Sequence, residues 1–160
     1  MADRTTGNAP GDPARPGQGE EPAGPVLETL DEAECLRLVA PGGIGRLAYL
    51  GRFGLTVMPV NFRLHGGTIV FRTALHSSTD EDLRTGIAGA EYQVTFEVDE
   101  VDITAREGWS VLIQGSAHHV DTADEYASML EAGVDTWPGN KEHFLRILPT
   151  RITGRRIRQR

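Results

Sequence analysis

The residue types that most often carry chemistry are scattered along this chain without the spacing of a catalytic or metal site. The single cysteine, Cys35, has no histidine or lysine placed to activate it, so we expect a buried structural thiol. His118 and His119 are neighbours on a predicted strand and point to opposite faces, so they cannot both bind one metal ion. The sequence contains no nucleophile elbow, phosphate-binding loop or dinucleotide fingerprint. We therefore predict no catalytic side chain and no metal site from these residues.

The charge distribution argues against nucleic acid and membranes as partners. The 160-residue chain has a formal net charge of −7 and a pI near 5.2, whereas both partners attract a basic surface. Arginines at positions 151, 155, 156, 158 and 160 lie near the end of the chain without an aromatic platform. We expect these arginines on an exposed closing strand, and we expect a small-molecule partner. The carboxylates of Asp99, Glu100 and Asp102 are expected in a solvated loop.

The composition separates a tail from one folded domain. The first 25 residues contain five prolines and five glycines and almost no large apolar side chain, so they cannot offset the entropy cost of ordering. We predict a disordered tail over residues 1–26 and a single domain over residues 27–160. No apolar run approaches the roughly 20 residues of a membrane helix, and the start lacks the apolar segment of a secretion signal. Together with the single cysteine, these features predict a soluble, cytoplasmic protein.

The first half of the domain begins with one helix and then changes to the period of β-strands. Thr29 and Glu32 form a capping-box pattern, which predicts a helix that runs to about residue 40 and turns Ala33, Leu36 and Val39 to the core. A Pro-Gly-Gly sequence at residues 41–43 ends this helix. Alternating apolar residues then predict strands over residues 44–50, 55–64 and 68–73. The tight turn at residues 65–67 implies that the last two pair as an antiparallel hairpin.

The second half continues the antiparallel pattern with two short helices. Capping pairs begin these helices at Ser78 with Glu81 and at Thr122 with Glu125. Strict alternation predicts a strand over residues 91–99, and longer strands follow over residues 109–120 and 144–157. Gly115 is suited to a bend or bulge of the kind that barrels use to close. Because no βαβ repeat is present, the fold class is mainly β: an antiparallel β-barrel with peripheral helices.

Four segments, taken in order, carry a resemblance to a known family. They are Pro59-Val60-Asn61-Phe62, Ile69-Val70-Phe71-Arg72-Thr73, Gly108-Trp109-Ser110-Val111 and Ile152-Thr153-Gly154-Arg155-Arg156-Ile157. In order and spacing they resemble the short single-domain members of the pyridoxamine 5'-phosphate oxidase-like, FMN-binding split-barrel superfamily over residues 27–158. The resemblance implies a split, Greek-key-like β-barrel. It also implies a homodimer with two FMN molecules in grooves between the subunits.

The resemblance also implies a set of cofactor-binding residues. An isoalloxazine ring is flat and apolar with a polar edge, so it needs an apolar wall and backbone donors. The main chain of residues 58–62 would lie along the ring, Thr73 would bond the ring or ribityl chain, and Arg72 would hold the phosphate. Gln114 would reach the polar edge. The complete predicted set is Met58, Pro59, Val60, Asn61, Phe62, Phe71, Arg72, Thr73, Ser77, Ser78, Thr79, Trp109, Ser110, Val111 and Gln114.

The chain departs from the family pattern after Thr73. Many members continue with a glycine or serine and then a lysine or arginine that grips the phosphate, but this chain has no such cation. The anion would instead be held by Arg72, by the hydroxyls of residues 77–79 and by free N–H groups of the short helix. The three carboxylates of Asp80, Glu81 and Asp82 are expected to repel a dianion and to weaken flavin binding. Without the resemblance, Arg72 would be interpreted as a surface ion-pair residue and Trp109 as a core residue.

The first functional hypothesis is an FMN-binding, flavin-dependent oxidoreductase that acts on an unknown small substrate. The second is a reductase that uses a dissociable deazaflavin coenzyme, which the missing phosphate cation favours. The third is a noncatalytic module that binds flavin or haem, and haem would need His118 or His119 as a free axial ligand. A degenerate barrel that acts as an interaction protein is the last alternative. A true pyridoxamine phosphate oxidase is not expected, because a basic substrate-binding segment is missing near the end of the chain.

Overall fold

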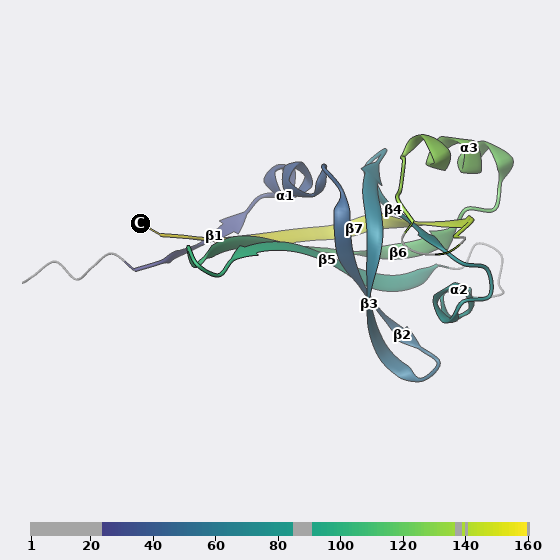
Figure 1. The fold of residues 1–160 in the computed structure, drawn as a ribbon, viewed down its shortest axis with the longest axis horizontal. Coiled ribbons are helices and arrows are strands. Elements are labelled where there is room, and N and C mark those ends of the chain that lie inside the picture. The colour runs from purple at the N-terminus through teal and green to yellow at the C-terminus, as the bar shows by residue number, and fades with distance from the viewer. Residues whose placement is uncertain (1–23, 85–90, 137–138, 140, 160) are drawn as a thin grey trace, which may run out of the picture.

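The computed structural model describes residues 24–84, 91–136, 139 and 141–159, and most of these residues lie in β-strands (Figure 1). The strands are β1 (Val26–Leu30), β2 (Gly43–Gly51), β3 (Gly54–His65), β4 (Thr68–Thr73), β5 (Tyr92–Asp102), β6 (Glu107–His119) and β7 (His143–Arg158). The helices are α1 (Glu32–Val39), α2 (Ser78–Asp82) and α3 (Ala123–Glu131). The mainly β fold class predicted from the sequence is confirmed.

All strand pairs are antiparallel, and their pairing closes the sheet into a ring. The strand order is β1-β7-β4-β3-β2-β5-β6, and β6 also pairs with β7. The long strand β7 makes this closure possible, because β6 follows it from Leu145 to Ile157 along one edge. The other edge of β7 pairs with β4 in its first half and with β1 in its second half. A six-stranded ring therefore carries β1 as an additional strand.

The inside of the ring holds the main hydrophobic core. Side chains from every strand of the ring fill it, including Phe62, Phe71 and Phe96, which are 0–2% exposed. Phe62 and Phe96 meet edge to face with ring centroids 5.1 Å apart. Helix α1 adds Cys35 and Val39 to this core, and the residue that follows α2, Leu83, joins it from another side. Two helices thus cover openings of the ring.

Helix α3 packs on the outside of the ring. A second, smaller cluster joins Val70 of β4, Phe144 of β7 and Met129 of α3, and the ring of Tyr126 meets Phe144 at 5.2 Å. The helix begins at Thr122, whose hydroxyl accepts a hydrogen bond from the Glu125 amide as predicted. One face of β4 and β7 is therefore buried inside the ring, and the other is buried under α3.

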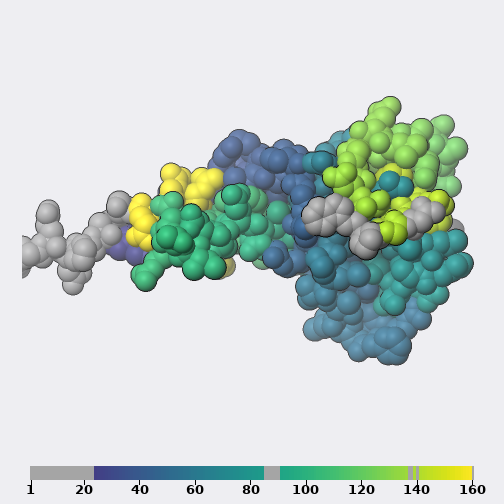
Figure 2. All heavy atoms as spheres, viewed as in Figure 1, coloured from purple at the N-terminus to yellow at the C-terminus, as the bar shows by residue number. Residues whose placement is uncertain are grey.

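An arm extends from the ring (Figures 1 and 2). We use this name for β1 together with the strand ends that pair beside it, residues 98–102, 107–111 and 154–158. Helix α1 packs against the base of the arm. There Gly154 leaves room for Cys35, because a Cβ at position 154 would lie 2.5 Å from the Cys35 sulfur.

The structure corrects the sequence-based account of the first helix. Strand β1 was not predicted, and the capping box at Thr29 and Glu32 is wrong because Thr29 lies in β1 and pairs with Arg155. The N-cap of α1 is Asp31, which accepts a hydrogen bond of 2.8 Å from the Glu34 amide. Ala33, which was expected to face the core, is exposed. The helix therefore begins later than predicted.

Several local predictions are confirmed. The β3–β4 hairpin turns at Gly66 and Gly67, whose φ angles of 56° and 76° favour glycine. The pairing register of β6 and β7 shifts between Gln114 and Gly115, where the bulge was predicted. Helix α2 is short as expected, although its N-cap is Ser77 and not Ser78.

Residues 1–23 of the predicted tail lie outside the described residues. Within the described ranges, none of the helices has the length and apolar character needed to cross a membrane.

Candidate functional site

The predicted cofactor residues fall into different parts of the structure. The side chains of Phe62, Phe71 and Val111 lie in the core inside the ring and are 0–2% exposed, so only their main chains could reach a ligand. Val60 is half-buried against the same core. The other predicted residues lie near α2, under α3, on the outside of the sheet or on the arm.

The group near α2 is joined by hydrogen bonds between side chains. Thr73 and Ser77 share a hydrogen bond of 2.7 Å between their hydroxyl oxygens. The hydroxyl of buried Thr79 donates to the sulfur of Met58 at 2.7 Å and lies 3.5 Å from the Tyr49 hydroxyl. Sequence reasoning therefore grouped residues that do meet in space. Their hydroxyls are largely occupied with one another, and Ser78 is the exposed member of the group.

Asp80 is the most buried charged residue of this region and was not predicted as part of the site. It is 1% exposed. Its carboxylate accepts hydrogen bonds from the His76 amide at 3.0 Å, from His119 Nε2 at 2.9 Å and from Arg84 at 3.2 Å. Burial would raise the pKa of Asp80, but these three donors outweigh it and hold the pKa below its ordinary value. The carboxylate is therefore charged and fully engaged.

The other two carboxylates after Thr73 are also neutralised. Arg52, in the turn between β2 and β3, bonds Asp82 at 2.6 Å and Glu81 at 2.7 Å. Three free carboxylates were expected here to repel a dianion. In the structure they are not free, because each carboxylate has a cationic or N–H partner. The sequence could not reveal this, since Arg52 and His119 lie about 30 and 39 residues away from their partners.

Arg72 differs from these paired residues. It lies on β4 opposite Phe144 of β7, half-buried, with its guanidinium 4.8 Å from the centre of the Phe144 ring. Its Nε is buried without a hydrogen-bond partner. Within the described part of the chain no carboxylate pairs with it, so the surface ion pair expected without the resemblance is not present. A cation that is partly desolvated and unpaired is suited to bind an anion.

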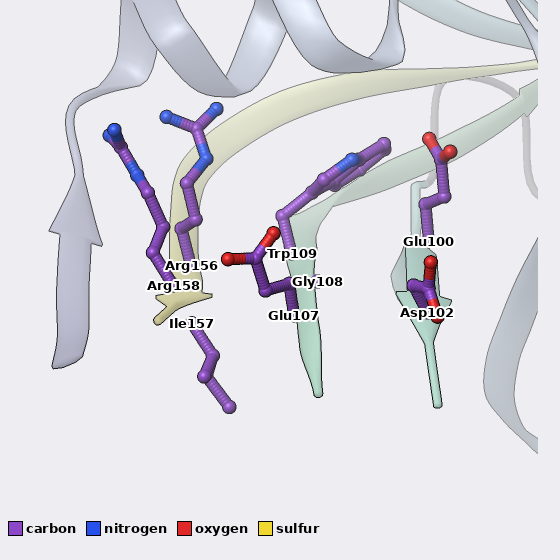
Figure 3. Close-up of a pocket in the computed structure, with 8 residues that line it drawn as sticks. All are labelled: Glu100, Asp102, Glu107, Gly108, Trp109, Arg156, Ile157 and Arg158. Atoms are coloured by element: carbon purple, nitrogen blue, oxygen red, sulfur yellow. The ribbon is translucent and has the colours of Figure 1, made fainter. Parts of the chain in front are cut away.

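Trp109 lies on the arm (Figure 3), which extends away from the part of the molecule that carries α2 (Figure 1). It lines an open groove of about 390 Å³, with Arg156 and Arg158 on one side and Glu100 on the other. Trp109 also packs partly against the core. One chain therefore does not bring Trp109 and its neighbour Ser110 together with Thr73 and Ser77.

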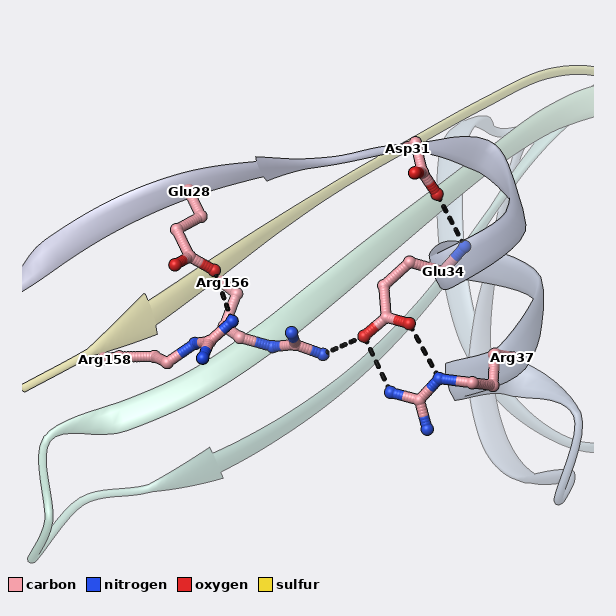
Figure 4. Close-up of polar contacts among 6 residues, drawn as sticks. All are labelled: Glu28, Asp31, Glu34, Arg37, Arg156 and Arg158. Carbon is pink, nitrogen blue, oxygen red and sulfur yellow. Dashed lines mark hydrogen bonds and ion pairs between the residues drawn. The ribbon is translucent and has the colours of Figure 1, made fainter.

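Ion pairs stabilise the arm and α1 (Figure 4), and one of them, between Arg156 and Glu34, joins the two. Glu34 accepts hydrogen bonds from Arg37 at 2.7 Å and from Arg156 at 2.5 Å. These two bonds lower the pKa of Glu34 from 4.5 to about 2. Arg158 bonds Glu28 of β1 at 2.7 Å. Two of the five C-terminal arginines are thus structural ion-pair residues.

The outer face of the sheet carries the remaining predicted residues, Pro59, Asn61, Ser110 and Gln114. The amide oxygen of Gln114 accepts a hydrogen bond of 3.2 Å from Arg151. Antiparallel partners point to the same side of a sheet, so the pairing registers place many exposed apolar residues on this face as well. They are Leu27, Ile44, Leu50, Leu55, Val57, Val101, Leu112 and Ile157.

His119 and the cysteine have structural surroundings. His119 Nε2 is bonded to Asp80 and is therefore not a free axial ligand for haem. Within the described ranges, no three residues of metal-binding type lie close enough to hold an ion. Cys35 is fully buried, and burial together with Asp31 and Glu34 raises its pKa, as expected for an unreactive thiol.

Comparison with known proteins identifies relatives of this chain. The family model described as Pyridoxamine 5'-phosphate oxidase matches residues 31–156. The uncharacterized protein Rv0080 of Mycobacterium tuberculosis is 30% identical over 131 residues, which are 80% of this chain and 84% of the relative.

Two solved structures have the same fold. An FAD binding protein from Mycobacterium smegmatis is 30% identical with a TM-score of 0.68, over 82% of this chain and 100% of that one. A putative pyridoxamine 5'-phosphate oxidase from Corynebacterium glutamicum is 29% identical with a TM-score of 0.65, over 86% of this chain and 96% of that one. The resemblance predicted from the four sequence segments is confirmed, and this chain belongs to the pyridoxamine 5'-phosphate oxidase family.

Proposed function

We propose that this protein binds a flavin, with FMN as the first candidate, and acts as a flavin-dependent oxidoreductase on a small substrate. Membership of the family and the similarity to an FAD binding protein support the flavin. The single structural observation that carries the proposal is Arg72, whose half-buried guanidinium has no counter-ion within the described residues. A flavin phosphate would supply the missing anion.

The chain's own residues would bind and orient the cofactor. Arg72 would hold the anionic group, and the half-buried side chains of Asn61 and Ser110 and the exposed side chain of Gln114 offer donors and acceptors to a polar ring edge. The bound flavin would supply hydride or electron transfer, so no nucleophilic side chain is required. Cys35 is buried and His119 is hydrogen-bonded to Asp80, which agrees with a protein that positions the cofactor and leaves the chemistry to it. A cytoplasmic location remains part of the proposal and rests on the sequence alone.

We infer that the working unit is a homodimer joined through the outer face of the sheet. Antiparallel sheets usually present a polar face to water, yet Leu55 is 89% exposed, Val57 66% and Val101 61% on this one face. On the arm the face is hollowed into a largely apolar groove of about 630 Å³. An apolar surface of this extent on one side of a small chain is typical of a subunit interface.

The charges on this face favour a second copy of the same chain as the occupant. The β5 side carries Glu97 and Asp99, which share Arg46, and the β7 side carries the exposed Arg151 and Arg155. A two-fold axis along β6 would place the acidic side of one copy over the basic side of the other. The same packing would bring Ser110 of one copy towards the second, which would explain why one chain holds Ser110 apart from Thr73.

Purified full-length protein tests the cofactor directly. We expect it to be yellow and to release a flavin on denaturation, which mass spectrometry identifies as FMN or another flavin. A colourless protein that binds neither FMN nor FAD in a fluorescence titration contradicts the proposal. The bound flavin should also be reducible and should be reoxidised by small acceptors in repeated cycles; a flavin that never cycles indicates a carrier and not an enzyme.

Arg72→Ala tests the residue that carries the proposal. A hydrogen-bonded charge contributes about 1.5–3 kcal/mol, so FMN affinity should fall roughly 10–100-fold. Arg37→Ala is the matched control, because Arg37 is an exposed arginine on α1 that pairs with Glu34. Unchanged affinity in Arg72→Ala removes this residue from the site.

A further inference from the structure

The short segment that follows β4 contains a cradle of N–H donors around one buried carboxylate. The donors come from three places: the backbone of His76, the side chain of His119 at the end of β6, and Arg84 just after α2. All three converge on Asp80. Since a carboxylate only accepts hydrogen bonds, His119 Nε2 carries the proton in this contact.

These donors form an anion-binding site, and the anion that occupies it is a side chain of the protein itself, Asp80. Two side chains that can be cationic and one amide surround a negative group that is 1% exposed. Another donor at the start of α2, the Asp80 amide, is bonded to the Ser77 hydroxyl at 3.2 Å. The His76 amide and the Nε2 proton of His119 both bond Asp80, so these two donors of the cradle are already engaged.

We propose that Asp80 is an internal anion that saturates this cradle, so that the protein does not recognise a cofactor phosphate beside α2. This inference rests on the proposed flavin binding where it concerns specificity, and it deepens that proposal. The anionic group of the flavin is left to Arg72, which lies on the other side of β4 from the Thr73 hydroxyl and pairs with no carboxylate among the residues that the structure describes. Asp80 is thus a specificity-determining residue that acts by occupying a site.

The first test needs no flavin. Asp80→Ala empties the cradle and should lower the melting temperature of the full-length protein. Sodium formate, which has the size and charge of the lost carboxylate, should then raise it again relative to sodium chloride. The rise should be about 3–6 °C at roughly ten times the formate Kd. Asp82→Ala is the matched control, because the carboxylate of Asp82, whose side chain is 7% exposed, pairs with Arg52 and not with the donors around Asp80. Equal effects of formate and chloride on Asp80→Ala overturn the proposal.

The second test uses Arg84→Ala, which keeps Asp80 in place and changes a residue whose side chain is 44% exposed. Affinities for riboflavin and FMN are measured by titration. If the cradle is closed to phosphate, the FMN-to-riboflavin affinity ratio stays within about twofold of the wild-type ratio. In Arg72→Ala the same ratio falls about tenfold or more, since one charged contact to the phosphate is lost.

The outcomes separate this inference from the proposed function. A tenfold fall of the FMN-to-riboflavin affinity ratio in Arg84→Ala would show that the cradle binds the phosphate, and it would overturn the inference. Failure of every variant to bind any flavin contradicts the proposed function, and the formate experiment then still decides whether Asp80 fills an anion cradle.

Discussion

Gly154 is the position where a single methyl group should disturb the contact between α1 and the arm. A Cβ there would lie 2.5 Å from the sulfur of Cys35 and 3.2 Å from both the Leu30 side chain and the Ser110 carbonyl. Cys35 is 0% exposed, so the core packs around its sulfur. Gly154→Ala therefore forces the helix and the strand apart.

The expected magnitude follows from two opposing effects. Overpacking of a well-packed core costs about 1–3 kcal/mol. Replacing glycine by alanine on an ordinary backbone recovers about 0.4–1 kcal/mol by restricting the unfolded chain. The net loss for Gly154→Ala should be about 1–2 kcal/mol, which corresponds to a fall in melting temperature of roughly 2–8 °C for a chain of this size.

Thermal or urea unfolding of the full-length protein measures this loss. Gly24→Ala is the control, since no atom lies within 4 Å of a Cβ at that position. The combination with Cys35→Ala removes the colliding sulfur, so the double variant should be more stable than the sum of the two single losses by about 1 kcal/mol. Additive losses, or an unchanged stability in Gly154→Ala, would refute the packing of α1 on β7 described above.

Three further predictions concern the acid response, the core and the interface. The lowered pKa of Glu34 means that its ion pairs stabilise the fold above pH 4.5 and are lost as the pH falls towards about 2; the melting temperature of Glu34→Gln should therefore vary less over that interval than that of the wild type. Phe96→Ala should cost about 3–5 kcal/mol in urea unfolding, because the ring is fully buried against Phe62. Val57→Glu should halve the mass measured by light scattering, whereas Ala127→Glu on the exposed side of α3 should leave it unchanged.

Much of the fold follows from local patterns. The β3–β4 hairpin is specified by alternating side chains and by Gly66-Gly67, whose positive φ angles suit the turn. Thr122 caps α3 through the amide of Glu125, only three residues away. These features depend on near neighbours in the chain, so the sequence is sufficient to predict them.

Parts of the candidate site could also be predicted. The resemblance grouped Met58, Thr73, Ser77 and Thr79, and the structure joins them in two hydrogen-bonded pairs near α2. It did not reveal that these hydroxyls are already occupied, nor that Asp80 is buried beside them. An acidic residue in a helical first turn is normally exposed, so its sequence context indicated a solvated carboxylate.

By itself, the sequence determined the strand periodicity, two of the helices, the bulge at Gly115 and the family, because hydrogen bonding to near neighbours and side-chain alternation leave a local pattern. Only the tertiary structure decided that residues 26–30 form a strand, since β1 is held by residues of β7 more than 120 positions away. It also decided which charges are compensated. Arg52 and His119 bond carboxylates of the acidic segment after β4, whereas Arg72 has no carboxylate partner in the described part of the chain. Such contacts between distant residues leave no periodic signal in the sequence.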